Sequence, residues 1–292
     1  MIIGITGGTG FIGNAIQEAA ASSGDQVILF SRHPEFLREA RRFTSTTVPD
    51  VNGCEGLIHL AGESIMGFWT KEKRRKILES RREGTRRLVE GIAQASRKPS
   101  VLVSASAVGY YGDCGDQILD ETSPPGSGFL SEVTKIWEEE ALQAEQFGVR
   151  VVLLRFGLVL GKNGGAMKFI QPLFRWGLGG RLGSGNQWMS CIDIHDVAGL
   201  ALYCLHTPSI TGPVNAVMPH PMTNREFTKT VAKAVERPAF FHVPAWCLRL
   251  ALGDLSHLVL DSQRVIPSKA VQHGYQFCFP SLKESLSEFK LN

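Results

Sequence analysis

The sequence has no segment able to cross a membrane, because its 292 residues contain no run of 18 or more uncharged apolar residues. We also expect no cleavable leader, since Met1 runs directly into Ile2 to Ile5, a pattern typical of a buried strand. We therefore expect a cytoplasmic protein with no membrane partner.

Patterns of metal-binding and disulfide chemistry are also missing. The six cysteines stand at 54, 114, 191, 204, 247 and 278, and none lies within ten residues of another. There is no Cys-x-x-Cys, no paired Cys/His spacing and no His-Glu-x-x-His among the eight histidines. We expect reduced thiols and no metal site, and we interpret His195 beside Asp196 as a structural cap.

A strong excess of charge is absent as well. Lys and Arg total 31 against 28 Asp and Glu, a formal net charge of +3, which does not indicate a nucleic-acid partner. Hydrophobic residues make up 43% and charged residues 20%, which is the composition of a globular protein. The length suits one large domain or two smaller ones.

Short apolar segments alternate with amphipathic ones in the first half of the chain. The predicted strands are Ile2 to Thr6, Val27 to Phe30, Gly56 to Ala61, Val101 to Ser106 and Val149 to Phe156; the predicted helices are Phe11 to Ser22, about 71–96 and 132–147. This alternation predicts an α/β fold with a doubly wound parallel (Rossmann) sheet.

The second half has a different texture, with clustered glycines after Gly157 that predict loops and a last helix at about 224–235. We predict a nucleotide-binding Rossmann domain over residues 1–160, with return segments near 191–217. Residues 161–190 and 218–292 would form a smaller C-terminal lobe that closes a substrate cleft.

A glycine loop joins the first strand to the first helix. Gly7, Gly10 and Gly13 follow the spacing Gly-x-x-Gly-x-x-Gly, with Thr9, Phe11 and Ile12 between them. Such a loop needs one glycine for a tight turn, one for close approach of the backbone to pyrophosphate, and one for packing of helix on strand. The free N–H groups of the following helix would bind the phosphates. These six residues are predicted to bind a dinucleotide.

The end of the second strand selects between NAD and NADP. An NAD site places an acidic residue there, whereas this chain has Ser31 and Arg32 and no acid before Glu35. A guanidinium pairs with a 2′-phosphate through two N–H groups, and a serine hydroxyl adds a further donor. We therefore predict NADP as the cofactor, the alternative being that Arg32 is a solvated residue at a strand end.

Several motifs together resemble the extended, epimerase-like branch of the short-chain dehydrogenase/reductase superfamily. They are Thr6 to Gly13, His59 to Gly62, Ser104 to Gly112, Arg155 to Gly161 and Ile192 to Ala198. The chain is most similar to an atypical subfamily labelled epimerase-family, nucleoside-diphosphate-sugar epimerase-like or cell-division inhibitor proteins. Its hallmarks are Leu60 to Ile65, Ser104 to Gly112, Leu182 to Gln187 and a C-terminal segment of unknown function, about 245–291.

The resemblance implies further cofactor contacts. The backbone after the fourth strand would border the adenosine and ribose, and the residues we assign to the cofactor there are Leu60, Ala61, Gly62 and Glu63, with Val133 on a later helix.

The resemblance implies a catalytic pair, Tyr-x-x-x-Lys, and this chain departs from it. With Lys135 as the lysine, the tyrosine position holds Ser131, which is also suited to cap a helix. Three alternatives stay open: Ser106 with Tyr110 or Tyr111 supplies the proton, Lys135 acts itself or holds the ribose, or NADP binds without turnover. A lost general acid or base typically removes about 10²- to 10⁴-fold of rate.

The stretch Lys71 to Arg87 carries nine basic and three acidic residues, as a solvated helix face would. On a helical wheel, however, Arg81 falls within the apolar stripe of Ile77, Leu78 and Leu88. A buried arginine needs an anionic partner, and the cofactor phosphates or Glu63 are the candidates.

The sequence thus predicts an NADP(H)-binding, epimerase-like oxidoreductase of atypical short-chain type, monomeric or homodimeric, with a small-molecule substrate of unknown identity. The alternatives are a non-catalytic NADP(H)-responsive binding protein and a partner-binding regulator.

Overall fold

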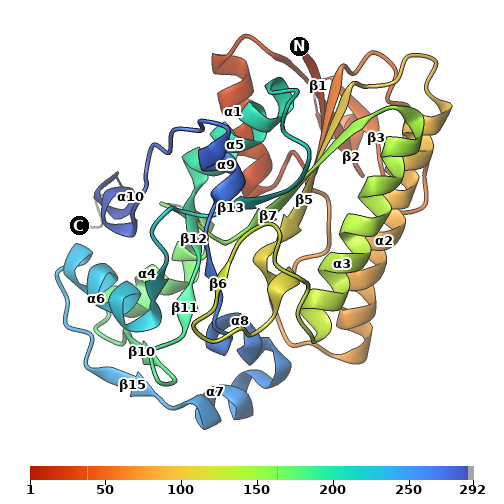
Figure 1. Cartoon of the computed structure of the whole chain (residues 1–292). Helices are drawn as coiled ribbons and strands as arrows, with labels where there is room; N and C mark the ends of the chain where they lie inside the picture. Colours follow the sequence, from red (N-terminus) through yellow and green to blue (C-terminus); the bar gives the residue numbers. More distant parts are fainter. Residues whose placement is uncertain (38, 163, 289–292) are drawn as a thin grey trace.

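A seven-stranded parallel sheet forms the centre of the computed structural model, which describes residues 1–37, 39–162 and 164–288 (Figure 1). The strand order is β13-β7-β5-β4-β1-β2-β3. The bounds are β1 Ile2–Thr6, β2 Gln26–Ser31, β3 Ala40–Arg42, β4 Gly56–His59, β5 Val101–Ala107, β7 Arg150–Phe156 and β13 Gly212–Ala216. The order runs outward in both directions from the pair β1 and β4, so a topological switch point lies between them. The predicted doubly wound parallel sheet is confirmed.

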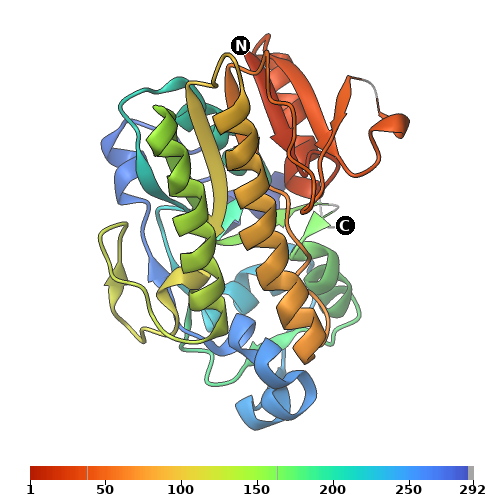
Figure 2. The same ribbon diagram turned by 90° about the vertical axis from the view of Figure 1, so that its right-hand side faces the viewer.

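Helices cover both faces of this sheet. Helices α1 (Phe11–Ser22) and α5 (Ile194–His206) pack on one face through a core that includes Ile16, Ala20 and Val197. Helices α2 (Lys71–Gln94) and α3 (Phe129–Leu142) lie side by side on the other face (Figure 2). Residue for residue, α1 matches its predicted span. Within the described residues, we find no helix with the length and apolar character needed to span a bilayer.

The segment after Gly157 is more ordered than predicted. We expected loops there, but the chain forms β8 Leu158–Gly161, β9 Gly164–Gly165, α4 Met167–Arg175, β10 Gly180–Leu182, β11 Trp188–Met189 and β12 Cys191–Asp193. These elements are short, and their strands pair in small separate sheets, so they lack the long periodic patterns that identify strands and helices in a sequence. The glycines still serve local turns, as at Gly177, Gly183 and Gly185, where φ is positive.

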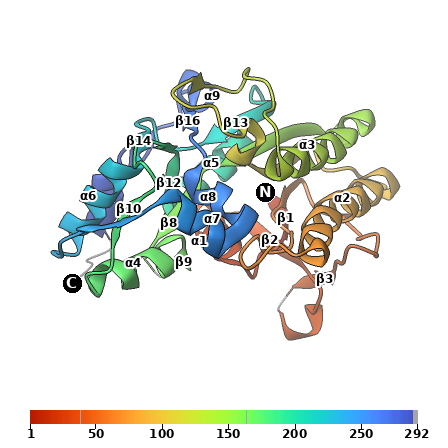
Figure 3. The same cartoon turned by 90° about the horizontal axis from the view of Figure 1, so that it is seen from below.

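The remaining elements lie mostly at the carboxyl edge of the sheet, where α7 and α8 occupy the middle of the view from below (Figure 3). Their bounds are β14 Met222–Thr223, α6 Asn224–Ala234, β15 Phe241–Val243, α7 Ala245–Leu252, α8 His257–Leu260, β16 Arg264–Val265, α9 Ser268–Gln272 and α10 Leu282–Glu288. The last four residues of the predicted lobe, 289–292, lie outside the described part of the chain.

The end of the chain is bonded back into the α/β half. Strand β16 pairs in parallel with β6 (Ile118–Leu119), in the loop after β5. Glu121 accepts hydrogen bonds from the N–H groups of Asn215 and Lys269, at 3.0 and 3.1 Å. Asp196 of α5 accepts from the N–H groups of Cys278 and Phe279, at 2.8 and 2.9 Å. The C-terminal segment therefore completes the polar contacts of buried acids in the first half.

A buried ion pair fixes α3 against the sheet. Arg155 of β7 donates from Nε and Nη2 to the two carboxylate oxygens of Glu138 on α3, both at 2.8 Å. The two side chains are 3% and 7% exposed, so neither charge is shared with solvent. Such a pair constrains geometry strongly, because loss of one partner leaves an uncompensated buried charge.

Candidate functional site

A cleft of about 630 Å³ opens at the carboxyl ends of β1, β4, β5 and β7. Its walls come from the glycine loop, the segment after β4, the ends of β5 and β7, α2, α3 and residues 257–263. This is the topological switch point of the sheet, where ligands bind in open α/β folds. Ten of the predicted site residues line it: Gly7, Gly10, Phe11, Ile12, Gly13, Leu60, Gly62, Glu63, Arg81 and Ser106.

The three glycines of the loop have distinct steric roles. Gly7 has a φ of +70°, and a Cβ there would stand 2.9 Å from the backbone nitrogen of Ala61. A Cβ on Gly13 would lie 2.5 Å from the carbonyl oxygens of Gly7 and Gly8, so this glycine permits helix and loop to pack. At Gly10 a Cβ would meet only the Gly7 oxygen, at 3.3 Å. Packing of the loop therefore does not by itself require a glycine at position 10, whereas a side chain there would project into the cleft.

The segment after β4 is positioned by a buried polar chain. The Thr6 hydroxyl lies 2.6 Å from Nδ1 of His59, whose Nε2 lies 3.0 Å from the Thr85 hydroxyl on α2. Burial lowers the pKa of His59 to about 3, so the ring is neutral at physiological pH. The Thr6 oxygen also accepts from the backbone N–H groups of Leu60 and Ala61. This arrangement holds the backbone of the next residues against the cleft.

Arg81 lines the cleft as a cation without a carboxylate partner within 4 Å in the described part of the chain. Its Nη1 donates to the backbone oxygens of Glu63 and Ile77, at 3.0 and 3.2 Å, and its guanidinium lies 4.9 Å from the ring centre of Trp137. Burial lowers the pKa of Arg81 to about 10, which still leaves it charged at neutral pH. A cation in this state favours an anionic ligand.

Glu63 has a different partner from the one we predicted. Its carboxylate accepts from Nζ of Lys73 at 2.6 Å, whereas Arg81 contacts only its backbone oxygen. The Lys73 hydrogen bond lowers the pKa of Glu63, and the charge of Arg32 acts in the same direction. Arg32 does not line the cleft; it directly follows β2, the strand that pairs with β1 next to the glycine loop.

Four other predicted cofactor residues do not line the cleft: Thr9, Ser31, Ala61 and Val133. The Ser31 hydroxyl accepts from the N–H of His33 at 3.1 Å, and Val133 is buried.

Ser106 is the last residue but one of β5 and lines the cleft, but its hydroxyl proton is already engaged. It donates to Oε1 of Glu138 at 2.6 Å, and Glu138 is in turn held by Arg155. The serine oxygen therefore presents its lone pairs to the cleft and is suited to accept a hydrogen bond there.

The two predicted tyrosines are held away from the cleft. Tyr111 is fully buried, donates to Asn215 Oδ1 at 2.7 Å and accepts from Arg155 Nη1 at 3.0 Å. Burial raises the pKa of Tyr111 to about 12. The Tyr110 ring stacks under the Arg155 guanidinium, 3.5 Å from it. Neither tyrosine lines the cleft, so among Ser106, Tyr110 and Tyr111, the three hydroxyls considered as proton sources, Ser106 alone lies there.

Neither Ser131 nor Lys135, the residues of α3 at the Tyr-x-x-x-Lys positions, lines the cleft. Lys135 points outward with a side chain 57% exposed, 3.9 Å from Glu139. Ser131 is buried, not an N-cap, and its hydroxyl lies 2.8 Å from the Tyr110 carbonyl oxygen. The residues of α3 that line the cleft are Leu130, Thr134 and Trp137. Leu130 and Thr134 are four residues apart, so they occupy one face of the helix, and neither has a titratable side chain.

Sequence reasoning assigned the C-terminal segment to a lobe over the cleft but named none of the residues that line it. His257, Leu258, Val259, Asp261 and Gln263 all line the cleft. Nδ1 of His257 lies 2.8 Å from the Asp261 carboxylate, and burial raises the pKa of Asp261. The i, i+4 spacing of the pair is visible in the sequence, but nothing in it shows that this short helix folds back over the sheet.

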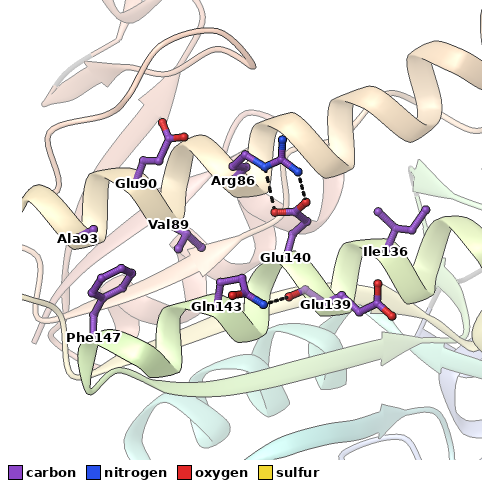
Figure 4. Close-up of a pocket in the computed structure, with 9 residues that line it drawn as sticks. All are labelled: Arg86, Val89, Glu90, Ala93, Ile136, Glu139, Glu140, Gln143 and Phe147. Atoms are coloured by element: carbon purple, nitrogen blue, oxygen red, sulfur yellow. Dashed lines mark hydrogen bonds and ion pairs between the residues drawn. The ribbon is translucent and has the colours of Figure 1, made fainter.

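A second hollow, of about 490 Å³, lies between α2 and α3, away from the strand ends (Figure 4). Arg86 and Glu140 bridge the two helices across it, and Gln143 donates to the backbone oxygen of Glu139 (Figure 4). It contains none of the predicted site residues, and these polar groups bond one another. The switch-point cleft is therefore the candidate site.

The family model described as "NAD dependent epimerase/dehydratase family" matches residues 3–216. The chain belongs to this family. A domain of unknown function, DUF1731, matches residues 243–289, the segment that supplies the cleft wall.

Two relatives and one solved structure extend the likeness over nearly the whole chain. The epimerase family protein YfhF of Bacillus subtilis is 35% identical over 99% of this chain and 97% of its own length. The chloroplastic SDR39U1 homolog of Arabidopsis thaliana is 35% identical over 98% and 86%. The crystal structure of human epimerase family protein SDR39U1 (isoform2) with NADPH matches with a TM-score of 0.93 and 33% identity, covering 100% of both chains. The predicted resemblance is confirmed.

The glycine loop yields a test with an internal contrast. Gly10→Val should still fold, because the backbone φ at Gly10 is −83° and the Cβ makes one tight contact, 3.3 Å from the Gly7 oxygen, yet it should abolish NADPH binding by filling the cleft. Gly13→Val should instead destabilise the protein, because its Cβ collides with the loop backbone. Thermal unfolding and calorimetric titration measure the two effects; tight NADPH binding by folded Gly10→Val would contradict the assignment.

Arg81 and Arg86 form a matched pair on α2. Arg81→Ala should weaken NADPH binding at least about tenfold, since one charge-assisted hydrogen bond contributes about 1.5–3 kcal/mol. Arg86→Ala should leave binding unchanged, because Arg86 pairs with Glu140 in the other hollow. Equal effects of the two substitutions on the dissociation constant would show that the cleft cation plays no special part.

Proposed function

We propose that this chain binds NADP(H) in the switch-point cleft and acts as an oxidoreductase of the epimerase family. The observation that carries the proposal is the pairing of two features in one cleft. Gly10 leaves space that a Cβ would fill, and Arg81 brings a cation without a carboxylate partner among the described residues. The NADPH complex of the human relative supports the same choice of cofactor.

The chain offers a group for each part of a dinucleotide. The N–H groups of Phe11, Ile12 and Gly13 at the start of α1 would hold the pyrophosphate, helped by the helix dipole and the lack of acidic residues in its first turn. Arg32, directly after the carboxyl end of β2, would bind the 2′-phosphate. Ser106 would accept a hydrogen bond from a ligand amide or hydroxyl. The chemistry supplied by the bound cofactor is hydride transfer.

The site differs from a standard short-chain dehydrogenase in its proton chemistry. The face of α3 that would carry Tyr-x-x-x-Lys presents Leu130 and Thr134, so neither a phenol nor an ammonium group reaches the cleft from there. Ser106 is committed as a donor to Glu138 and does not serve as a base. His257 lines the cleft and is oriented by Asp261, and its imidazole would be the group that exchanges a proton with a substrate.

A second function is NADP(H)-responsive binding without turnover. The residues that α3 presents to the cleft favour it. Leu130 and Thr134 cannot replace a general acid or base. In that case the NADP(H)-bound protein, and not a product, would be the output of cofactor binding.

We further propose that the two parts of the chain bind different molecules. Residues 1–160, with the return at 191–217, would hold the cofactor, and residues 161–190 and 218–292 would enclose a small-molecule substrate. We propose a cytoplasmic protein that works as a monomer or homodimer, with no nucleic-acid partner.

Cofactor choice is tested by titrating NADPH and NADH into the wild-type protein. We expect NADPH to bind at least about tenfold more tightly, from one or more charge-assisted contacts to the 2′-phosphate. Arg32→Ala should remove this preference, whereas Arg75→Ala should retain it, because Arg75 lies on the outer face of α2 with Glu79. Equal affinity for the two dinucleotides, or a preference that survives Arg32→Ala, would refute the role of Arg32.

Turnover is tested with 4-nitrobenzaldehyde as a carbonyl probe, following loss of NADPH absorbance. We expect the wild type to oxidise NADPH slowly. The rate should rise about 10²-fold or more in the Leu130→Tyr/Thr134→Lys variant, which places a phenol and a lysine on the face of α3 that lines the cleft. Lys135→Met, the control, should change nothing because Lys135 points outward. If wild type and double variant both bind NADPH without oxidising it, the non-catalytic function is favoured; loss of activity in Lys135→Met would restore Lys135 to the site.

A further inference from the structure

The part of the cleft contributed by the start of α3, by β11 and by α8 has a distinct chemical character. It is formed by Leu130 of α3, Trp188 and Met189 of β11, and Leu258 and Val259 of α8. We call this group the outer wall. Trp137 of α3 also lines the cleft, but it belongs to the side of the cation, because the Arg81 guanidinium lies 4.9 Å from its ring centre. We propose, on the basis of the NADP(H)-binding function above, that the outer wall takes an uncharged, mainly apolar substrate and not a nucleoside diphosphate sugar.

The charges of the cleft support this choice. Among the described residues that line it, the charged or titratable acids and bases are Glu63, Arg81, His257 and Asp261. Glu63 and Arg81 belong to the segments after β4 and on α2, on the side of the glycine loop. His257 and Asp261 are paired with each other at 2.8 Å. The outer wall therefore has no cation available for a phosphate.

Polar side chains near the outer wall are also occupied. Nε1 of Trp188 donates to Asp116 at 2.8 Å, and the Gln263 amide donates to the Gly112 oxygen at 3.0 Å. The Ser190 hydroxyl donates to the Gln263 backbone oxygen at 2.7 Å. Arg264 stacks on the Trp188 ring at 4.2 Å and does not line the cleft.

These contacts make a diphosphate a poor occupant. A diphosphate loses strongly bound water on entering a cleft, and the loss must be offset by cations or several free N–H donors. An apolar ligand instead gains from displacing water from tryptophan, leucine and methionine surfaces. The Trp188 indole suits an aromatic group in particular.

The test uses two probes on protein saturated with NADPH. Prodan, an uncharged naphthyl ketone, should bind saturably with one molecule per chain and increase its fluorescence. UDP-glucose should neither bind in calorimetry at comparable concentrations nor displace Prodan. Displacement of Prodan by UDP-glucose, or tighter binding of UDP-glucose than of Prodan, would overturn the proposal.

A matched pair of variants locates the probe. Leu258→Asp, in the outer wall, should weaken Prodan binding at least about tenfold, because it places a charge where an apolar contact was. Leu250→Asp should leave Prodan binding unchanged, because Leu250 is 81% exposed on α7 and does not line the cleft. Equal loss in both variants would place Prodan on the exposed surface and overturn the proposal.

The NADPH titration that precedes these measurements separates two kinds of failure. If NADPH itself does not bind, the proposed function fails. If NADPH binds and UDP-glucose occupies the cleft, only the inference about the outer wall fails.

Discussion

The ion pair between Arg155 and Glu138 controls the arrangement of much of the site. Two opposite charges inside a protein must stay together, since separating them leaves a charge without compensation in a medium of low polarity. Arg155 is fixed by its strand, so Glu138 fixes the rotation of α3 about its own axis. The same two residues engage the Ser106 hydroxyl, the Tyr111 hydroxyl and the Tyr110 ring. One buried contact thus decides which groups are turned toward the cleft and which are withheld from it.

The features with a strict local cause could be predicted from the sequence. The strand, glycine loop and helix at the N-terminus were predictable because periodicity and steric demand act within a dozen residues. The position of Arg81 also followed from helical spacing. The face of α3 that meets the cleft did not follow from the position of Lys135, because a lysine alone does not show which side of a helix is buried. Trp137 and Glu138 are buried, whereas Lys135 pairs with Glu139 in solvent. Neighbouring residues of a helix point about 100° apart, so an assignment that is one residue out moves a side chain off the buried face.

The outer part of the cleft illustrates a second limit. Trp188 and Leu258 are 70 positions apart in the chain, and they meet because residues 257–263 fold back under the carboxyl edge of the sheet. No periodic pattern records such a contact, and the segment belongs to a domain type with no assigned function. In this protein that domain type provides one wall of the cleft, so a family name based on the first 216 residues describes only part of the surface that a substrate meets.

The bonds from the C-terminal segment to Glu121 and Asp196 have a consequence for biosynthesis. A ribosome delivers the α/β half first, and at that stage these two acids lack the backbone N–H groups of Lys269, Cys278 and Phe279. Burial raises the pKa of both carboxyls even in the finished protein, so burying them without those partners is costlier still. The nascent nucleotide-binding half therefore stays incomplete, with the region around β13 and α5 unsealed, until residues 269–279 have been synthesised. Completion of the first half thus depends on a segment that is made well after its own last strand.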